Sequence, residues 1–118
     1  MTTKEEEYDF DNWTEEDDDK ALKSLTTVQH VIAGDKFIGR FSDGTIVKLP
    51  LNFSLETAKE LDSLGEDSIA KFQRLLKLFA GEETAEELEK RPLVAVAILT
   101  EKYFRAVNRS QELAFPKL

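Results

Sequence analysis

Apolar residues recur with a helical period through the second half of the chain, and residues typical of helix caps mark where the helices begin. Ser54 and Asp67 are suited to cap two helices, because a short polar side chain can accept a hydrogen bond from the free N–H groups of a first turn. Thr84 and Glu87 match a capping box that would open a third helix. Glycine after a helix and proline in a first turn suit the remaining ends. The pattern therefore predicts helices over residues 55–64, 68–80, 84–91 and 92–108.

The second and fourth of these helices have the clearest apolar faces. In the second, one face holds Ile69, Phe72, Leu75, Leu76 and Phe79. The fourth opens with the apolar run Leu93–Leu99, which favours a central buried element, and continues with Tyr103 and Val107 on the inner face. A buried strand is the competing interpretation of that run. The helical period of the residues that follow favours a helix.

Before residue 50 the pattern becomes that of strands. Lys36–Phe41 and Thr45–Leu49 are rich in β-branched and aromatic residues, and the Asp-Gly pair between them is typical of a tight turn. Pro50 is expected to end the second strand because it has no N–H to donate. A hairpin over residues 36–49 is only marginally stable alone, so we expect it to pack on helices or pair with another strand. In residues 21–35, valine and isoleucine favour extended backbone and a Gly-Asp pair predicts a turn.

Charge divides the chain into two parts. The 118 residues include 24 acidic and 16 basic side chains, for a net charge of −8. Residues 1–20 hold ten of the acids and two of the bases, so residues 21–118 are neutral. The first 20 residues cannot bury enough apolar surface to offset the loss of chain entropy. We therefore expect a disordered acidic N-terminal arm over residues 1–20 and a single small domain over residues 21–118. The predicted fold class is α+β and mostly helical, with one β-hairpin and about four helices.

Composition argues against nucleic-acid binding, thiolate chemistry and a membrane-spanning segment. A neutral body with an acidic arm lacks the basic surface that nucleic-acid binding needs. The chain has no cysteine, which excludes disulfides and thiolate chemistry. No apolar run approaches the roughly 20 residues that span a bilayer. We expect a cytoplasmic protein that binds neither nucleic acid nor membrane.

No group of residues indicates catalysis. His30 is the only histidine, and the sequence suggests no nucleophile or carboxylate partner for it, so a partly exposed connecting residue is the simpler interpretation. The run Asp17-Asp18-Asp19 lacks the spaced ligands and the glycine of a calcium loop and is interpreted as solvated like charges. The glycines form no phosphate-binding motif. We predict no catalytic residue, no metal site, no cofactor and no enzymatic activity.

Two surfaces are candidates for binding a protein partner. The acidic arm is interrupted by Tyr8, Phe10 and Trp13. Acidic–aromatic segments often order on a partner, whereas a solubilising arm, or aromatics folded back onto the body, are the alternatives. On the last helix, Lys102, Arg105 and Arg109 form a basic stripe. The stripe is a solvated face in the simpler interpretation, and in the other it receives an acidic segment of this chain or of a partner.

The order of features over residues 36–108 resembles a known family. The stretch FIGRFSDGTIVKLPLNFSLETAKELDSL resembles the hairpin that opens the small tail assembly chaperones of long-tailed, siphovirus-like bacteriophages. The stretch FQRLLKLFAGEETAEELEKRPLVAVAILTEKYFRAV resembles the section that follows there: an amphipathic helix ending in glycine, a short acidic helix and a longer helix. The acidic arm lies outside the resemblance. Glu82-Glu83 follow the central glycine, where the family often has an aromatic residue.

The resemblance implies a non-enzymatic assembly chaperone in the host cytoplasm. Such proteins are thought to coat the helical tape-measure protein and to gather tail-tube subunits around it, with apolar stripes that cover the partner's apolar helices. Phe72, Leu76 and Phe79 are the candidates for a partly buried stripe, and full burial in the core is the other interpretation. A homo-oligomer is left open. The alternative function is a cytosolic adaptor or regulator whose acidic–aromatic arm binds a basic protein partner or mimics nucleic acid.

Overall fold

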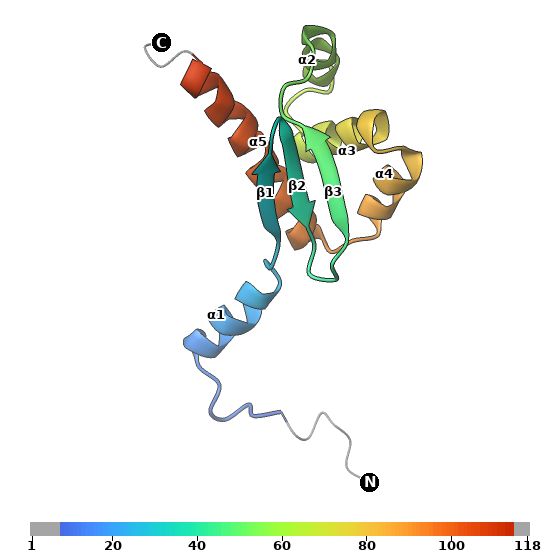
Figure 1. The fold of residues 1–118 in the computed structure, drawn as a ribbon. Helices are drawn as coiled ribbons and strands as arrows, with labels where there is room; N and C mark the ends of the chain where they lie inside the picture. The colour runs from blue at the N-terminus through green and yellow to red at the C-terminus, as the bar shows by residue number, and fades with distance from the viewer. Residues whose placement is uncertain (1–7, 115–118) are drawn as a thin grey trace.

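The computed structural model describes residues 8–114, which form a three-stranded sheet, a layer of helices on one side of it, and one helix that projects from the body (Figure 1). The fold class is α+β and mostly helical, as the pattern predicted. In chain order the elements are α1 (Glu15–Ser24), β1 (Gln29–Ala33), β2 (Lys36–Arg40), β3 (Ile46–Pro50), α2 (Leu55–Asp62), α3 (Ser68–Phe79), α4 (Glu82–Glu89) and α5 (Leu93–Ala114).

The sheet is antiparallel in the order β1-β2-β3. The hairpin that the pattern predicted is β2–β3, and β1 adds a third strand to it. A two-residue turn joins β1 to β2, and Gly34 in that turn has a φ of 63°, which side chains with a Cβ rarely adopt. The β2–β3 loop is longer: the Phe41 N–H donates to the Thr45 carbonyl at 2.9 Å, and Gly44 takes a φ of 90°.

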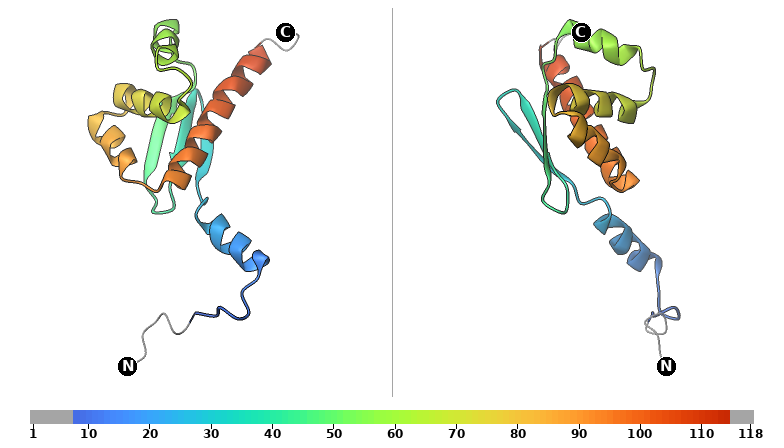
Figure 2. Two further views of the ribbon diagram at one scale, coloured as in Figure 1. Left: turned by 180° about the vertical axis from the view of Figure 1, so that it is seen from behind. Right: turned by 90° about the vertical axis from the view of Figure 1, so that its right-hand side faces the viewer.

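The core lies between one face of the sheet and helices α3 and α5. Because side chains alternate along a strand, Phe37 and Gly39 of β2 point to the same side as Val47 and Leu49 of β3, and all four are buried. Both views in Figure 2 place α3 and α5 over this side, with α4 packed on α3. The buried apolar residues are Val28, Phe37, Phe41, Val47, Leu49, Leu61, Phe72, Leu75, Leu76, Ala85, Leu88, Val96, Leu99, Tyr103 and Val107.

Helix α5 approaches the sheet very closely at Gly39. A Cβ at this glycine would lie 2.6 Å from Cδ1 of Leu99. One turn further along α5, the ring of Tyr103 packs edge-on against Phe37 with the ring centroids 5.3 Å apart, and its hydroxyl donates to the carbonyl of Pro50. Burial raises the pKa of Tyr103 above its ordinary value, so the hydroxyl keeps the proton that it donates.

Two predicted helix caps form as the sequence indicated. Ser54 Oγ accepts a hydrogen bond from the Thr57 N–H at 3.1 Å at the start of α2. Asp67 Oδ1 accepts one from the Ala70 N–H at 3.0 Å at the start of α3. These side chains fix where the two helices begin because they satisfy N–H groups that have no partner within the helix.

The last two helices differ from their predicted bounds. Helix α4 begins at Glu82, and only Ala80 and Gly81 separate it from the end of α3. Gly81 takes a φ of 101°, which allows the chain to change direction there. Thr84 is therefore inside α4 and caps nothing: its hydroxyl donates to the Ala80 carbonyl at 3.2 Å. Helix α5 continues past residue 108 to Ala114. Its apolar opening is not buried all round, since Leu93 is largely exposed.

Helix α1 occupies part of the predicted disordered arm. Residues 15–20 are its first six residues, so the structure differs from the prediction there. Residues 1–7 of the predicted arm, and residues 115–118, lie outside the described residues. The acidic arm therefore contains an ordered element that the pattern did not predict.

Candidate protein-binding surfaces

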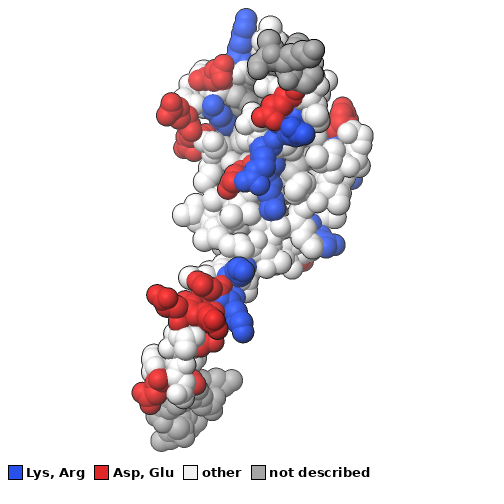
Figure 3. Space-filling view, turned by 90° about the vertical axis from the view of Figure 1, so that its left-hand side faces the viewer, with Lys and Arg blue, Asp and Glu red and all other residues white. Residues whose placement is uncertain are grey.

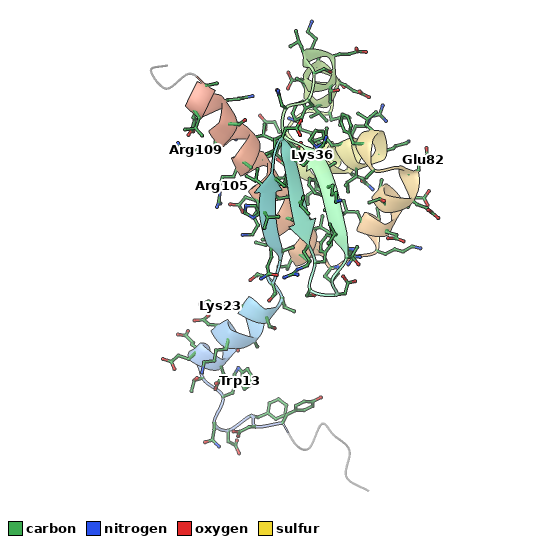
Figure 4. All side chains as sticks on the ribbon, in the orientation of Figure 1. Trp13, Lys23, Lys36, Glu82, Arg105 and Arg109 are labelled. Carbon is green, nitrogen blue, oxygen red and sulfur yellow. The ribbon has the colours of Figure 1, made fainter. Side chains whose placement is uncertain are left out.

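The three aromatic residues of the arm are exposed. The exposed fractions are 60% for Tyr8, 81% for Phe10 and 54% for Trp13. The rings of Tyr8 and Phe10 lie edge to face with their centroids 6.2 Å apart. The indole N–H of Trp13 donates to the Asp18 carboxylate, so the Trp13 ring lies beside the first turn of α1 (Figure 4). The aromatics do not fold back onto the body; they are available to a partner.

Helix α1 begins with a capping box, in which Thr14 and Asp17 each accept a hydrogen bond from the backbone N–H of the other. Thr14 Oγ1 accepts a hydrogen bond from the Asp17 N–H at 3.3 Å, and Asp17 Oδ2 accepts one from the Thr14 N–H at 3.0 Å. Acidic residues fill the first turn, where the partial positive charge of the helix dipole favours them. The Thr-x-x-Asp spacing is the signal that could have revealed this helix, and the run of acids obscured it.

One face of α1 combines carboxylates with exposed leucines. Helical spacing places five residues on this face, which we call the acidic helix face: Glu15, Asp18, Asp19, Leu22 and Leu25. Leu22 is 59% exposed and Leu25 55% exposed, and α1 has no buried residue in the described chain. Both views in Figure 2 show α1 directed away from the body. The acidic helix face is thus an amphipathic surface that the described part of the chain leaves exposed.

The side of the sheet opposite the helices is also uncovered. Among the described residues no helix packs over it, as Figures 1 and 2 show. We call it the bare sheet face; by strand alternation its members are Gln29, Val31, Ala33, Lys36, Ile38, Arg40, Ile46, Lys48 and Pro50. Val31 and Ile46 are 61% and 53% exposed, and with Ile38 they line a hollow of about 300 Å³. The centre of the bare sheet face is therefore apolar.

The charges on the bare sheet face are all positive. Its basic residues are Lys36, Arg40 and Lys48, and the three strands contain no acidic residue. Within residues 8–114 none of the three cations forms an ion pair; Arg40 donates to the side-chain oxygen of Gln29. An uncovered surface with an apolar centre and free cations suits a segment that is amphipathic and acidic.

The predicted basic stripe on α5 is largely neutralised. Arg105 pairs with Glu101 one turn away, and Arg109 pairs with Glu112 at 3.2 Å. These pairs lie along a groove of about 600 Å³ between α5 and the start of α3. Lys102 is half-buried and does not line this groove. Figure 3 shows many acidic side chains on the arm and both acidic and basic side chains on the body. The stripe does not receive the arm in this structure.

The predicted apolar stripe on α3 is mostly core. Phe72 and Leu76 are completely buried, because this face of α3 packs against β3 and α5. The prediction of a partly buried stripe is therefore wrong for these two residues. Phe79, at the end of α3, is 49% exposed and remains on the surface.

Asp43 and His30 both contact other side chains of the body. The pKa of Asp43 is lowered to about 2, chiefly by the Thr45 backbone N–H that donates to it at 2.9 Å, and also by Arg91, whose Nη1 lies 3.0 Å from its Oδ2. The Arg91 guanidinium also sits 4.2 Å from the centre of the Phe41 ring. His30 stacks on Phe37 with the ring centroids 5.0 Å apart.

The remaining chemistry of the described residues adds no further site. Within residues 8–114, no three histidine, aspartate or glutamate side chains are grouped so as to hold a metal ion. In the same part of the chain, no helix combines the length and apolar character needed to cross a bilayer. The arrangement offers two surfaces for non-covalent binding, the acidic helix face and the bare sheet face. Comparison with family models, curated proteins and solved structures finds nothing that matches this chain.

Proposed function

We propose that this protein is a non-enzymatic assembly chaperone that binds helical, amphipathic segments of other proteins. The bare sheet face is the observation that carries the proposal. It exposes Val31 and Ile46, with the half-buried Ile38 between them, beside cations that form no ion pair within residues 8–114, on a side of the sheet that no described element covers. Apolar surface of this kind, left open on a folded domain, is typical of sites that bind another polypeptide.

The partners that we propose are the tape-measure protein and the tail-tube subunits of a long-tailed bacteriophage, in the host cytoplasm. The resemblance of residues 36–108 to tail assembly chaperones supports this choice. Before the tail tube assembles around it, a long helical tape-measure protein exposes apolar helix faces. Binding at the bare sheet face would keep those faces from aggregating. The half-exposed Phe79 and the arm aromatics would extend the contact.

Co-expression with a tape-measure protein of a long-tailed bacteriophage tests the proposal. We expect the tape measure to remain soluble and to co-purify with the chain. The double variant Val31→Thr/Ile46→Thr keeps β-branched side chains and removes apolar contact, and should weaken binding about tenfold. Leu55→Thr is the control, because Leu55 is an exposed apolar residue at the start of α2, outside the bare sheet face.

Two results would count against the proposal. The first is a tape measure that aggregates to the same extent with and without the chain. The second is equal loss of binding in the sheet double variant and in Leu55→Thr, since this would separate binding from the bare sheet face. Circular dichroism of each variant should match the wild type, so that unfolding does not explain a loss.

The exposure of Tyr8, Phe10 and Trp13 favours one alternative, an adaptor or regulator that binds a basic protein through its arm. The triple variant Tyr8→Ala/Phe10→Ala/Trp13→Ala distinguishes the two functions. An adaptor loses its partner in this variant, and binding weakens steeply with salt in the wild type. A chaperone that uses the bare sheet face retains most of its affinity for the tape measure.

A further inference from the structure

We propose that the bare sheet face binds the acidic helix face of a second copy of this chain, so that two chains exchange their arms in a symmetric dimer. This inference concerns self-association and does not require the proposed function. It starts from two uncovered surfaces on one chain whose chemistry is complementary. Each has an apolar centre: Leu22 and Leu25 on α1, and Val31, Ile38 and Ile46 on the sheet.

Charge complementarity is the first argument. The acidic helix face has three carboxylates beside its leucines, and the bare sheet face has three cations beside its apolar centre. Asp18 accepts a hydrogen bond from the Trp13 indole. Glu15 and Asp19 form no ion pair within residues 8–114. Within the same residues, Lys36 and Lys48 of the sheet form no ion pair either. Contact between the two surfaces would pair each set of charges.

The two surfaces also match in length. A helix of 10 residues is about 15 Å long, and α1 has 10 residues. A strand of 5 residues is about 17 Å long, and each of the three strands has 5. A helix laid on the sheet along the strands would therefore cover the bare sheet face from end to end.

The junction between α1 and β1 is the reason to choose a second copy. The Leu25 N–H donates to the Leu22 carbonyl at 3.0 Å, and the Thr26 N–H to the Lys23 carbonyl at 3.0 Å. The Thr26 and Thr27 hydroxyls donate to carbonyls of the last turn as well, at 2.8 and 3.1 Å. These bonds hold Leu25, Thr26 and Thr27 against the last turn of α1, in the arrangement that directs α1 away from its own sheet. The same direction presents α1 to another molecule.

Reciprocal exchange makes the contact symmetric. If the arm of one copy lies on the sheet of the other, a twofold axis places the second arm on the first sheet. The contact then forms twice, and both surfaces of both copies are covered. Such an interface closes on itself, so the expected product is a dimer and not a filament.

Sedimentation equilibrium of the full chain tests the inference. In about 0.05 M salt the mass should rise with concentration to twice that of the monomer, and in about 0.5 M salt the dimer should weaken because the charge pairs are screened. Two charge-reversed variants should each dissociate at least about tenfold more readily. One is the sheet variant, Lys36→Glu/Lys48→Glu, and the other is the arm variant, Glu15→Lys/Asp19→Lys.

Each reversed variant has a control with the same change of charge. Lys59→Glu/Lys90→Glu alters two exposed lysines outside the sheet, and Asp11→Lys/Glu16→Lys alters two acids outside the acidic helix face. Both controls should dimerise within about twofold of the wild type. Because lysine in a first turn weakens a helix, Leu22→Ala/Leu25→Ala provides a second arm variant that preserves helix propensity and should also weaken the dimer.

Mixing the two reversed variants gives the sharpest result. The acidic arm of the sheet variant fits the basic sheet of the arm variant, and the basic arm of the arm variant fits the acidic sheet. The equimolar mixture should therefore form a heterodimer, although each variant alone dimerises at least about tenfold more weakly than the wild type. Recovery in the mixture requires contact between different chains, which an arm folded onto its own sheet cannot give.

Three results would overturn the inference. The wild type could remain monomeric at every concentration in low salt, as an arm bound to its own sheet or reserved for another protein would require. The controls could dissociate as readily as the reversed variants, which would make the effect one of net charge. The mixture could remain monomeric. None of these results involves the tape measure, so each leaves the proposed function standing. A tape measure that displaces the neighbour's arm is a further expectation, and it alone depends on the proposed function.

Discussion

Gly39 is the residue on which the packing of helix against sheet depends most closely. Its missing side chain allows Leu99 of α5 to approach the backbone of β2, and both residues are completely or almost completely buried. Because the core around Leu99 is closely packed, a methyl group at position 39 must displace the leucine side chain or the whole helix.

Gly39→Ala should lower the free energy of unfolding by about 1–3 kcal/mol. Urea unfolding measures this directly. The double variant Gly39→Ala/Leu99→Val removes a methylene at the point of contact and should lose less than the sum of the two single variants. A Gly39→Ala protein within about 0.5 kcal/mol of the wild type would show that α5 does not approach the sheet this closely.

Asp43 makes the stability of the β2–β3 loop depend on pH. Its folded pKa of about 2 lies below the ordinary value of 3.8, so the folded state favours the ionised carboxylate. The resulting stability is fully present above pH 4 and is lost as the pH falls from about 4 to about 2.

Asp43→Asn should therefore lower the melting temperature at neutral pH and lose its effect near pH 2. The amide oxygen of asparagine can still accept from the Thr45 N–H, whereas its attraction to Arg91 is gone. Melting curves of both proteins between pH 2 and pH 7 give the comparison. A constant difference across that range would contradict the role assigned to Asp43.

At the scale of elements, local capping signals decided which predictions succeeded. Ser54 and Asp67 were identified because each precedes an apolar period that confirms a helix. The prediction that Thr84 caps a helix was wrong because Gly81 is the N-cap of α4, which begins at Glu82. From sequence alone, a glycine that precedes α4 in this way cannot be distinguished from one that only ends α3. Thr14 was missed because the acids that follow it also indicate disorder. Phe72 and Leu76 could not be placed, since the same apolar face fits a core or a binding stripe.

Thr14→Ala should melt the first turn of α1 without affecting the body. The capping box contributes about 1 kcal/mol to the helix, and α1 has no buried residue in the described chain. Carbon chemical shifts of residues 15–24 should move toward coil values, whereas the urea midpoint should stay unchanged. A lower midpoint would mean that α1 supports the body by contacts absent from this structure.

At the scale of the whole molecule, the sequence predicts where the acidic residues lie but not where the basic residues without an ion pair lie. The pattern placed the negative charge on residues 1–20 and gave the basic residues of α5 two interpretations, a solvated face or an acceptor for an acidic segment. In the structure Arg105 and Arg109 of α5 are paired with neighbouring carboxylates, whereas Lys36, Arg40 and Lys48 on the bare sheet face form no ion pair within residues 8–114. That face could not be identified from sequence, because its members come from three strands and only their register brings them together.

The central claim is that the bare sheet face is the surface through which this protein binds an acidic, amphipathic helix. Methyl spectra of isoleucine-labelled full chain, recorded from dilute to concentrated solution in low salt, test it most directly. The isoleucines report on different surfaces: Ile38 and Ile46 on the bare sheet face, and Ile69 and Ile98 on α3 and α5. The account predicts that the signals of Ile38 and Ile46 shift with concentration while those of Ile69 and Ile98 stay fixed. Shifts at Ile69, which lines the groove beside α5, with Ile38 and Ile46 unchanged would contradict it.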